Sequence, residues 1–188
     1  MEDVDFLISR WQSGSGRQAY VAITECLASN SSLIKALELL PGANEAHGLD
    51  LRGIQIVGQH IPSFALDGCD LSYGCFDGST LERVSLTDSR LDKASFRRTV
   101  FIGNREFDFP AGMIGARAIQ AVFDEARCPG IVMDCGDFSH STFIGADLKN
   151  AQMSNAKFEG VSFERADLRG TNLSDSMCAN ASFQNAIR

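Results

Sequence analysis

Residues 136–188 read GDFSH STFIG ADLKN AQMSN AKFEG VSFER ADLRG TNLSD SMCAN ASFQN AIR when the chain is divided into blocks of five. The third residue of most blocks is Phe, Leu or Met, and the first residue is nearly always small. A helix buries residues at a period of about 3.6 and a strand at every second residue, so neither explains this pattern. The five-residue period predicts a chain that turns a corner at every block, with two side chains inward and three outward.

The same period occurs in residues 49–103, in a different frame. Large apolar residues again occupy the third position of each block, from Leu51 to Phe101. Two tracts of repeats, residues 49–103 and 131–188, are therefore predicted.

The blocks ADLKN, AKFEG and ADLRG resemble the pentapeptide repeat A(D/N)LXX, and the resemblance covers both tracts. It implies an all-β solenoid, a right-handed quadrilateral β-helix with four blocks per coil. Third positions that are four blocks apart should then stack in columns through the core. The residues expected in this core ladder are Leu71, Phe76, Leu91, Phe96, Phe138, Phe143, Leu148, Phe158, Phe163, Leu168 and Phe183.

Residues 1–48 lack the five-residue period, and their apolar spacing predicts helices over Asp3–Gln12, Arg17–Ala28 and Ser32–Leu40. We interpret them as a helical N-terminal cap over the open first coil, because the ends of a solenoid need covering. A helical docking module for a partner is the alternative.

Residues 104–130 interrupt the repeats and shift their frame by two residues. Asp108-Phe109-Pro110 is typical of a helix start, and an apolar stripe follows it. We therefore predict a helix-containing insertion between the two tracts. Its polar side chains are candidates for contact with a partner protein: Arg105, Arg117, Gln120, Asp124 and Arg127. The alternative is a segment that packs on one flank of the rod and has no other role.

The sequence shows no catalytic motif. The histidines His47, His60 and His140 lie far apart and lack metal-ligand spacing, and there is no Gly-rich phosphate loop. The frequent aspartates occupy outward repeat positions, where local turn hydrogen bonds are their ordinary role. We expect a protein that is not an enzyme and uses no cofactor or metal.

The N-terminus, MEDVDFLISRW, is acidic where a secretory signal would be basic, and no apolar run is long enough to cross a membrane. The six cysteines form no CxxC pair. Cytoplasmic residence with reduced thiols is the expectation. The last repeat offers a strand edge, so we also expect a homodimer through the C-terminal coils.

The expected function is a protein–protein interaction scaffold whose partner the sequence leaves open. The alternative comes from the resemblance: one branch of the family mimics DNA, binds DNA gyrase or topoisomerase IV and protects it from quinolones or toxins. The formal net charge of −7 agrees with that alternative and with no direct nucleic-acid binding. However, residues 49–188 hold 18 acidic and 14 basic side chains, which is nearly balanced. A DNA mimic should concentrate negative potential on the rod.

Overall fold

The computed structural model describes residues 3–29, 49–62, 65–103 and 111–188. Two helices and a short 3-10 turn come first, and three short strands follow within the repeats. The elements are α1 (Val4–Ser9), η1 (Arg10–Gln12), α2 (Gly14–Ser29), β1 (His60–Pro62), β2 (Thr80–Glu82) and β3 (Val100–Ile102).

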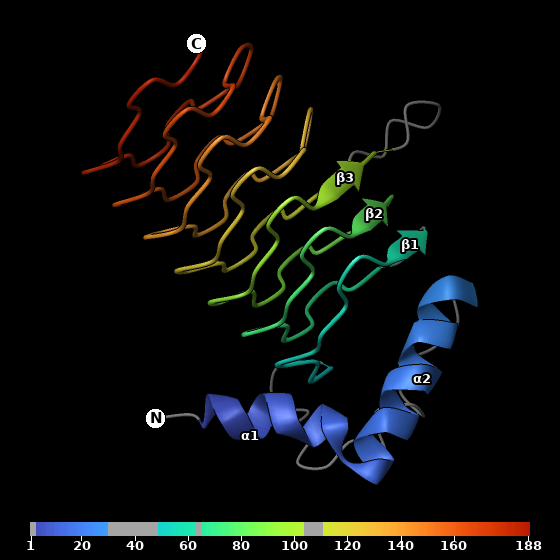
Figure 1. Ribbon diagram of the computed structural model, residues 1–188. Coiled ribbons are helices and arrows are strands. Elements are labelled where there is room, and N and C mark those ends of the chain that lie inside the picture. The colour runs from blue at the N-terminus through green and yellow to red at the C-terminus, as the bar shows by residue number, and fades with distance from the viewer. Residues whose placement is uncertain (1–2, 30–48, 63–64, 104–110) are drawn as a thin grey trace.

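The repeats form a rod of stacked coils (Figure 1). Strands β1, β2 and β3 pair in parallel, each shifted by 20 residues from the one before it. Most of the remaining contacts between coils are single parallel bridges with the same shift, such as that between Asp50 and Asp70. The β-helix expected from the repeat pattern is therefore present. We number its coils 1 to 7 by one column of inward residues: Leu51, Leu71, Leu91, Ala118, Phe138, Phe158 and Cys178.

Aromatic rings fill the centre of the rod. One column runs through most of its length, with successive ring centroids 4.7–5.3 Å apart and planes within 22°. Its members are Phe76, Phe96, Phe123, Phe143, Phe163 and Phe183. Each such pair contributes about 0.5–1.5 kcal/mol beyond simple burial. The residues expected in the core ladder are buried, except that Phe183 is only partly buried.

Hydroxyl side chains at the first position of a block also point inward. Ser79, Thr99 and Ser141 are fully buried or nearly so, and each donates a hydrogen bond to a carbonyl oxygen 23 residues earlier. Because a buried hydroxyl is costly unless it is hydrogen-bonded, these bonds explain why the first position accepts Ser and Thr as well as Ala.

The predicted helical insertion at residues 104–130 is wrong from residue 111 onward. Residues 111–130 form four further blocks, in which Met113, Ala118, Phe123 and Cys128 are the buried third residues. The bridges into this segment are shifted by 27 residues, as between Ser85 and Gly112, in place of the usual 20. The extra seven residues correspond to residues 104–110, which lie outside the described part of the chain.

The reason for the error is the composition of this coil. Ala and Cys occupy third positions at Ala118 and Cys128, where Leu or Phe is usual, and they hide the repeat. The alanines of this segment also favour a helix when the segment is considered in isolation. Contacts with both neighbouring coils override that local preference, because every outward bridge residue here pairs on both sides.

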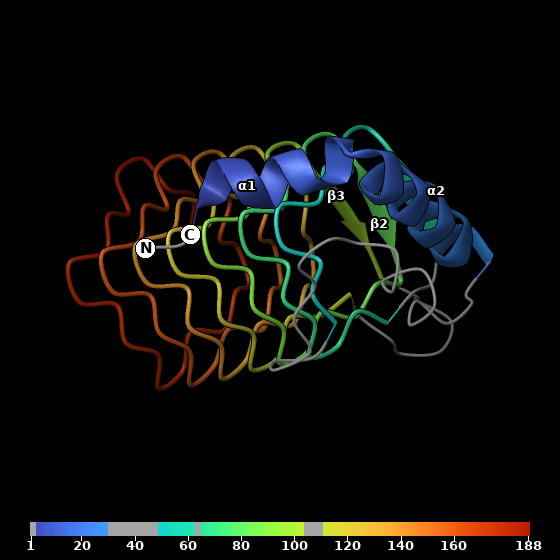
Figure 2. The same cartoon turned by 90° about the horizontal axis from the view of Figure 1, so that it is seen from below.

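The N-terminal helices pack against coil 1 at one end of the rod (Figures 1 and 2). Helix α1 begins at an N-cap, Asp3, whose carboxylate accepts a hydrogen bond from the Phe6 amide. Trp11 and Ile23 join the same hydrophobic cluster as Leu51. Helix thus occurs in both predicted ranges that are described, whereas the range Ser32–Leu40 lies outside the described residues.

Candidate interaction surfaces

The outward side chains of the rod form four flat faces. Each face is a column of bridge residues that pair from coil to coil. Face A consists of Asp50, Asp70, Arg90, Arg117, Asp137, Lys157 and Met177. Face B consists of Gln55, Cys75, Ser95, Val122, Thr142, Ser162 and Ser182. Face C consists of His60, Thr80, Val100, Arg127, Asp147, Asp167 and Ile187. Face D consists of Ala65, Ser85, Gly112, Val132, Gln152 and Asn172.

Two turn residues separate each face from the next and stand along the edges of the rod. We call these edges ridges AB, BC, CD and DA, after the faces that they join. The second turn residue has a positive φ, as at Gln120 (φ 58°) and His140 (φ 61°). This left-handed conformation sharpens each corner of the coil.

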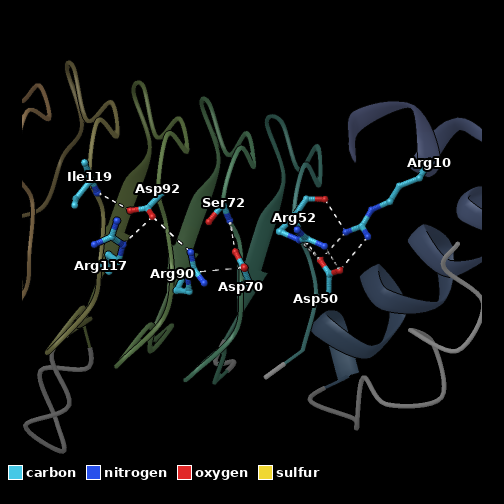
Figure 3. A network of polar contacts seen from close by, with 9 residues as sticks. All are labelled: Arg10, Asp50, Arg52, Asp70, Ser72, Arg90, Asp92, Arg117 and Ile119. Carbon is cyan, nitrogen blue, oxygen red and sulfur yellow. Dashed lines mark hydrogen bonds and ion pairs between the residues drawn. The ribbon is translucent and has the colours of Figure 1, made fainter. Parts of the chain in front are cut away.

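Face A carries charged side chains that bond to one another along the rod (Figure 3). At its start, Arg10 of η1 and Arg52 both bind the Asp50 carboxylate, at 2.8 and 2.9 Å. Arg10 and Asp50 are almost fully buried. Burial alone would raise the pKa of Asp50, but hydrogen bonds from Arg52 and Arg10 outweigh it and hold that pKa well below its usual range.

A second, separate group of ion pairs lies on coils 2 to 4 of face A (Figure 3). The Arg90 guanidinium lies 4.0 Å from the Asp70 carboxylate and 3.9 Å from that of Asp92 on ridge AB. Arg117 binds Asp92 at 2.8 Å, and the same carboxylate accepts the Ile119 amide at 3.0 Å. Charges of both signs are therefore held at fixed positions along this face.

The residues predicted as partner contacts do not share one surface. Arg117 belongs to face A and is bonded to Asp92, and Gln120 stands on ridge AB. Asp124 stands on ridge BC, where it accepts the Ile144 amide at 3.0 Å, and Arg127 belongs to face C. Helical spacing would have aligned these four, but the β-helix distributes them around the rod. Arg105 lies outside the described residues.

The sequence reasoning missed the role of Asp50, Asp92 and Arg10. The repeat frame could have shown that Asp50, Asp70 and Arg90 share a column, since each is an outward residue 20 positions from the next. The Arg10 contact had no comparable signal, because it joins the helices to coil 1 across 40 residues.

The described residues contain no group of three or more His, Cys, Asp or Glu side chains that could hold a metal ion. His60 contacts Glu82 at 3.0 Å, and His140 stands on ridge AB, while His47 is outside the described ranges. All six cysteines are free thiols. Burial raises the pKa of the Cys69 thiol to about 12, which makes it unreactive. No described helix is long and apolar enough to span a bilayer.

A sequence model of the family of pentapeptide repeats matches eight copies, at residues 66–103, 121–160, 137–175 and 151–187. These matches cover more than half of the chain. The chain belongs to the pentapeptide repeat family. One matched range begins at residue 121, within the segment that the sequence had predicted to be a helical insertion. This agrees with the repeat blocks that the structure shows at residues 111–130. A comparison with curated protein sequences found no match.

Several solved structures are similar to this pentapeptide repeat protein. HetL, a pentapeptide repeat protein from the cyanobacterium Nostoc sp. strain PCC 7120, is 14% identical over 77% of this chain and 91% of its own, with a TM-score of 0.30. A protein from the Arabidopsis thaliana thylakoid lumen is 26% identical over 67% of this chain and 66% of its own, with a TM-score of 0.29. QnrB1, a plasmid-mediated fluoroquinolone resistance protein, is 12% identical over 71% of this chain and 88% of its own, with a TM-score of 0.35. The family assignment rests on the repeat matches alone.

Proposed function

We propose that this protein is a non-catalytic scaffold that binds another protein through the outward side chains of its rod. The observation that carries the proposal is the run of ion pairs on face A and ridge AB that joins Asp70, Arg90, Asp92 and Arg117. Side chains held in place before binding lose little conformational entropy when a partner docks. A fixed pattern of alternating charge also selects a partner with the complementary pattern.

Partner binding can be tested by affinity capture from the source cell with the full chain as bait. A captured protein is identified, purified and titrated against the wild type and two matched variants. The Arg90→Gln/Arg117→Gln variant removes two cations from face A, and the Arg165→Gln/Arg169→Gln variant removes two exposed cations from other parts of the rod. Binding should weaken about tenfold or more in the first variant only. Equal binding by both variants would count against face A, and the absence of any specific partner would count against the scaffold.

One observation favours a second candidate, the topoisomerase-directed DNA mimic. Ridge DA carries only acidic charges among its described residues, namely Asp67, Asp88, Asp134 and Asp175. Against it, basic side chains interrupt the acidic ones on face A, where Arg90 and Arg117 stand between Asp70 and Asp137. A gyrase supercoiling assay with a quinolone decides between the candidates. Protection of gyrase by the protein would favour the mimic, and no protection at a large molar excess would exclude it.

End-to-end pairing of two chains through the C-terminal coils is also part of the proposal. Its support is the apolar surface of coils 6 and 7, where Leu173 and Phe183 are only partly buried and Met177 is 60% exposed. The variant Met177→Glu places a charge on this apolar surface and should weaken such a dimer. Sedimentation velocity would then show a smaller dimer fraction than for the wild type. Cytoplasmic residence is proposed as well, on the support of the exposed free thiol of Cys135.

A further inference from the structure

Face B and the two ridges beside it consist of described residues in every coil. The bridge residues of this face in coils 2 to 7 are all uncharged, short and half-buried: Cys75, Ser95, Val122, Thr142, Ser162 and Ser182. The longer side chain of Gln55 stands in coil 1, at the end of the face. Face B is therefore flat over six successive coils, and another flat surface can approach it closely.

Apolar side chains surround the middle of face B. Ile119 on ridge AB and Val122 on the face belong to coil 4, and Ile144 on ridge BC belongs to coil 5. Each of them is only half-buried. Because the core of a protein interface is more apolar than its rim, coils 4 and 5 are the natural centre of a contact on this face.

Ridge AB carries one cation and one anion that have no ion-pair partner among the described residues. Lys93 in coil 3 is exposed, and its ammonium group lies 5.4 Å from the centroid of the Tyr73 ring. Glu159 in coil 6 is also exposed. The other acid and base of this ridge, Asp92 and Arg52, are already ion-paired within the chain. Lys93 and Glu159 thus lie at equal distances on either side of the boundary between coils 4 and 5.

We propose that face B is the contact surface for a second copy of this chain, with the two rods side by side and antiparallel. The two-fold axis lies along the strand direction, between coils 4 and 5. It places ridge AB against ridge AB and coil 3 of each copy opposite coil 6 of the other. Lys93 of each copy then meets Glu159 of the other, so one symmetric contact contains this ion pair twice.

The charges disfavour the parallel arrangement of the two rods. A two-fold axis along the rods would place ridge AB against ridge BC, so Lys93 would meet Arg97 and Arg98 at its own level. In the antiparallel arrangement ridge BC meets itself. The charges of that ridge in coils 3 to 6 are balanced, with the acids Asp124, Glu125 and Glu164 and the bases Arg97, Arg98 and Arg165.

The other faces lack this combination of a flat surface with unpaired charges of both signs. Faces A and C carry long charged bridge residues. The described bridge residues of face D are uncharged, but the bases beside it are already bound to acids of the same chain: Arg83, Lys149 and Arg169. Face B is therefore the surface on which a second copy finds both a close fit and new ion pairs.

The size of the contact predicts a weak dimer. Six overlapping coils at about 4.8 Å give a length of about 29 Å, and three extended residues give a width of about 10 Å before the ridges are added. The buried area then falls at the low end for specific interfaces, below about 1,200 Å² in total. Self-association should depend on protein concentration and weaken with salt. This contact is separate from the end-to-end pairing and does not rest on the scaffold function.

Zero-length cross-linking of the wild-type protein tests the contact directly. A carbodiimide joins an amine to a carboxylate only where the two groups touch. Within one chain Lys93 and Glu159 are three coils apart, about 14 Å, so a link between them must join two copies. A mixture of isotope-labelled and unlabelled chains verifies this by mass spectrometry. The internal control is the link from Lys149 to Asp167, whose charged groups lie 3.3 Å apart within the chain.

The antiparallel contact predicts a Lys93–Glu159 link whose yield rises with protein concentration. Salt at about 1 M, where screening is nearly complete, should lower that yield severalfold. The contact is wrong if the Lys149–Asp167 link forms and the Lys93–Glu159 link does not. End-to-end pairing does not bring Lys93 to Glu159, so it cannot produce this link.

Charge reversal gives a second test, in a Met177→Glu background that weakens end-to-end pairing. Lys93→Glu and Glu159→Lys each place like charges at both ion-pair positions of their own dimer, whereas a mixture of the two proteins has opposite charges at both. Sedimentation velocity should show several-fold more dimer in the mixture than in either protein alone. Arg127→Glu and Asp175→Lys, on face C and ridge DA, are the matched controls and should each associate like the background protein. A mixture that associates no better than its components would contradict the proposal.

Discussion

The rings of Phe96 and Phe123 stack with their centroids 5.0 Å apart and their planes within 2°, although 27 residues separate them. Phe76 stacks on Phe96, and Phe143 on Phe123, with nearly the same geometry at the usual 20-residue separation. The column is therefore continuous across the seven extra residues. Continuity of the core makes the outward faces continuous as well, and those faces carry both proposals.

Replacement of Phe123 by Ala should lower the free energy of unfolding by about 3–5 kcal/mol, since the ring is fully buried between two others. Chemical denaturation monitored by circular dichroism measures the change. Val122→Ala is the matched control, because Val122 is the partly exposed neighbour on face B and should cost less than about 1 kcal/mol. Similar costs for the two variants would contradict the continuous column.

Deletion of residues 104–110 should preserve the fold. Joining residue 103 to residue 111 restores the 20-residue shift between Ser85 and its bridge partner Gly112. The expected result is an unchanged far-ultraviolet spectrum and a cooperative unfolding transition. Loss of cooperative unfolding would mean that these residues are needed within coil 3, between its blocks on faces C and D.

Ser141→Ala should destabilise the rod by about 1–3 kcal/mol, because it removes a buried hydrogen-bonded hydroxyl. The Ser141 hydroxyl donates to the Ala118 carbonyl oxygen at 2.5 Å and accepts from the Ala121 amide at 2.9 Å. Thermal unfolding compares this variant with Ser162→Ala, which changes a bridge residue on face B. Equal stability of both variants would show that the buried hydroxyl has no net effect.

The contact between Arg10 and Asp50 should make attachment of the N-terminal helices sensitive to acid. The folded protein lowers the pKa of Asp50 from an ordinary value of 3.8, so its stabilising effect is complete well above that pH. The effect is then lost as the pH falls below about 4 toward the folded pKa. Trp11 fluorescence and amide exchange in α1 report the detachment. Asp50→Asn should already loosen α1 at neutral pH and show a smaller change on acidification.

Gly160→Ala should destabilise the protein by more than the cost of placing alanine in a left-handed backbone conformation. Gly160 has a φ of 63°, and a Cβ there would lie 2.7 Å from Nδ1 of His140 in the preceding coil. Left-handed backbone costs a residue other than glycine about 1–2 kcal/mol, and the ring contact adds to that cost. A double-mutant cycle with His140→Ala should recover part of the loss. No coupling between the two changes would show that the imidazole moves aside freely.

The sequence predicted the rod and its columns well because the pattern of inward residues is repeated many times. Each block requires a small first residue and a large apolar third residue in the core. It failed at residues 111–130, where Ala118 and Cys128 replace the large residues and local helix propensity competes with stacking. The candidate site was harder to predict. Its residues are selected by contacts between coils and with the helices, as for Arg10 and Asp50. The repeat frame shows which outward positions share a face but not which side chains bind one another.

The continuity of the rod through residues 111–130 is the central claim, and nuclear Overhauser effects between aromatic rings test it most directly. Selective labelling of phenylalanine in the full chain should give strong contacts from the Phe123 ring to the rings of both Phe96 and Phe143. Contacts from Phe123 to neither ring, with helical amide contacts along residues 111–127, would contradict the continuous rod and the faces derived from it.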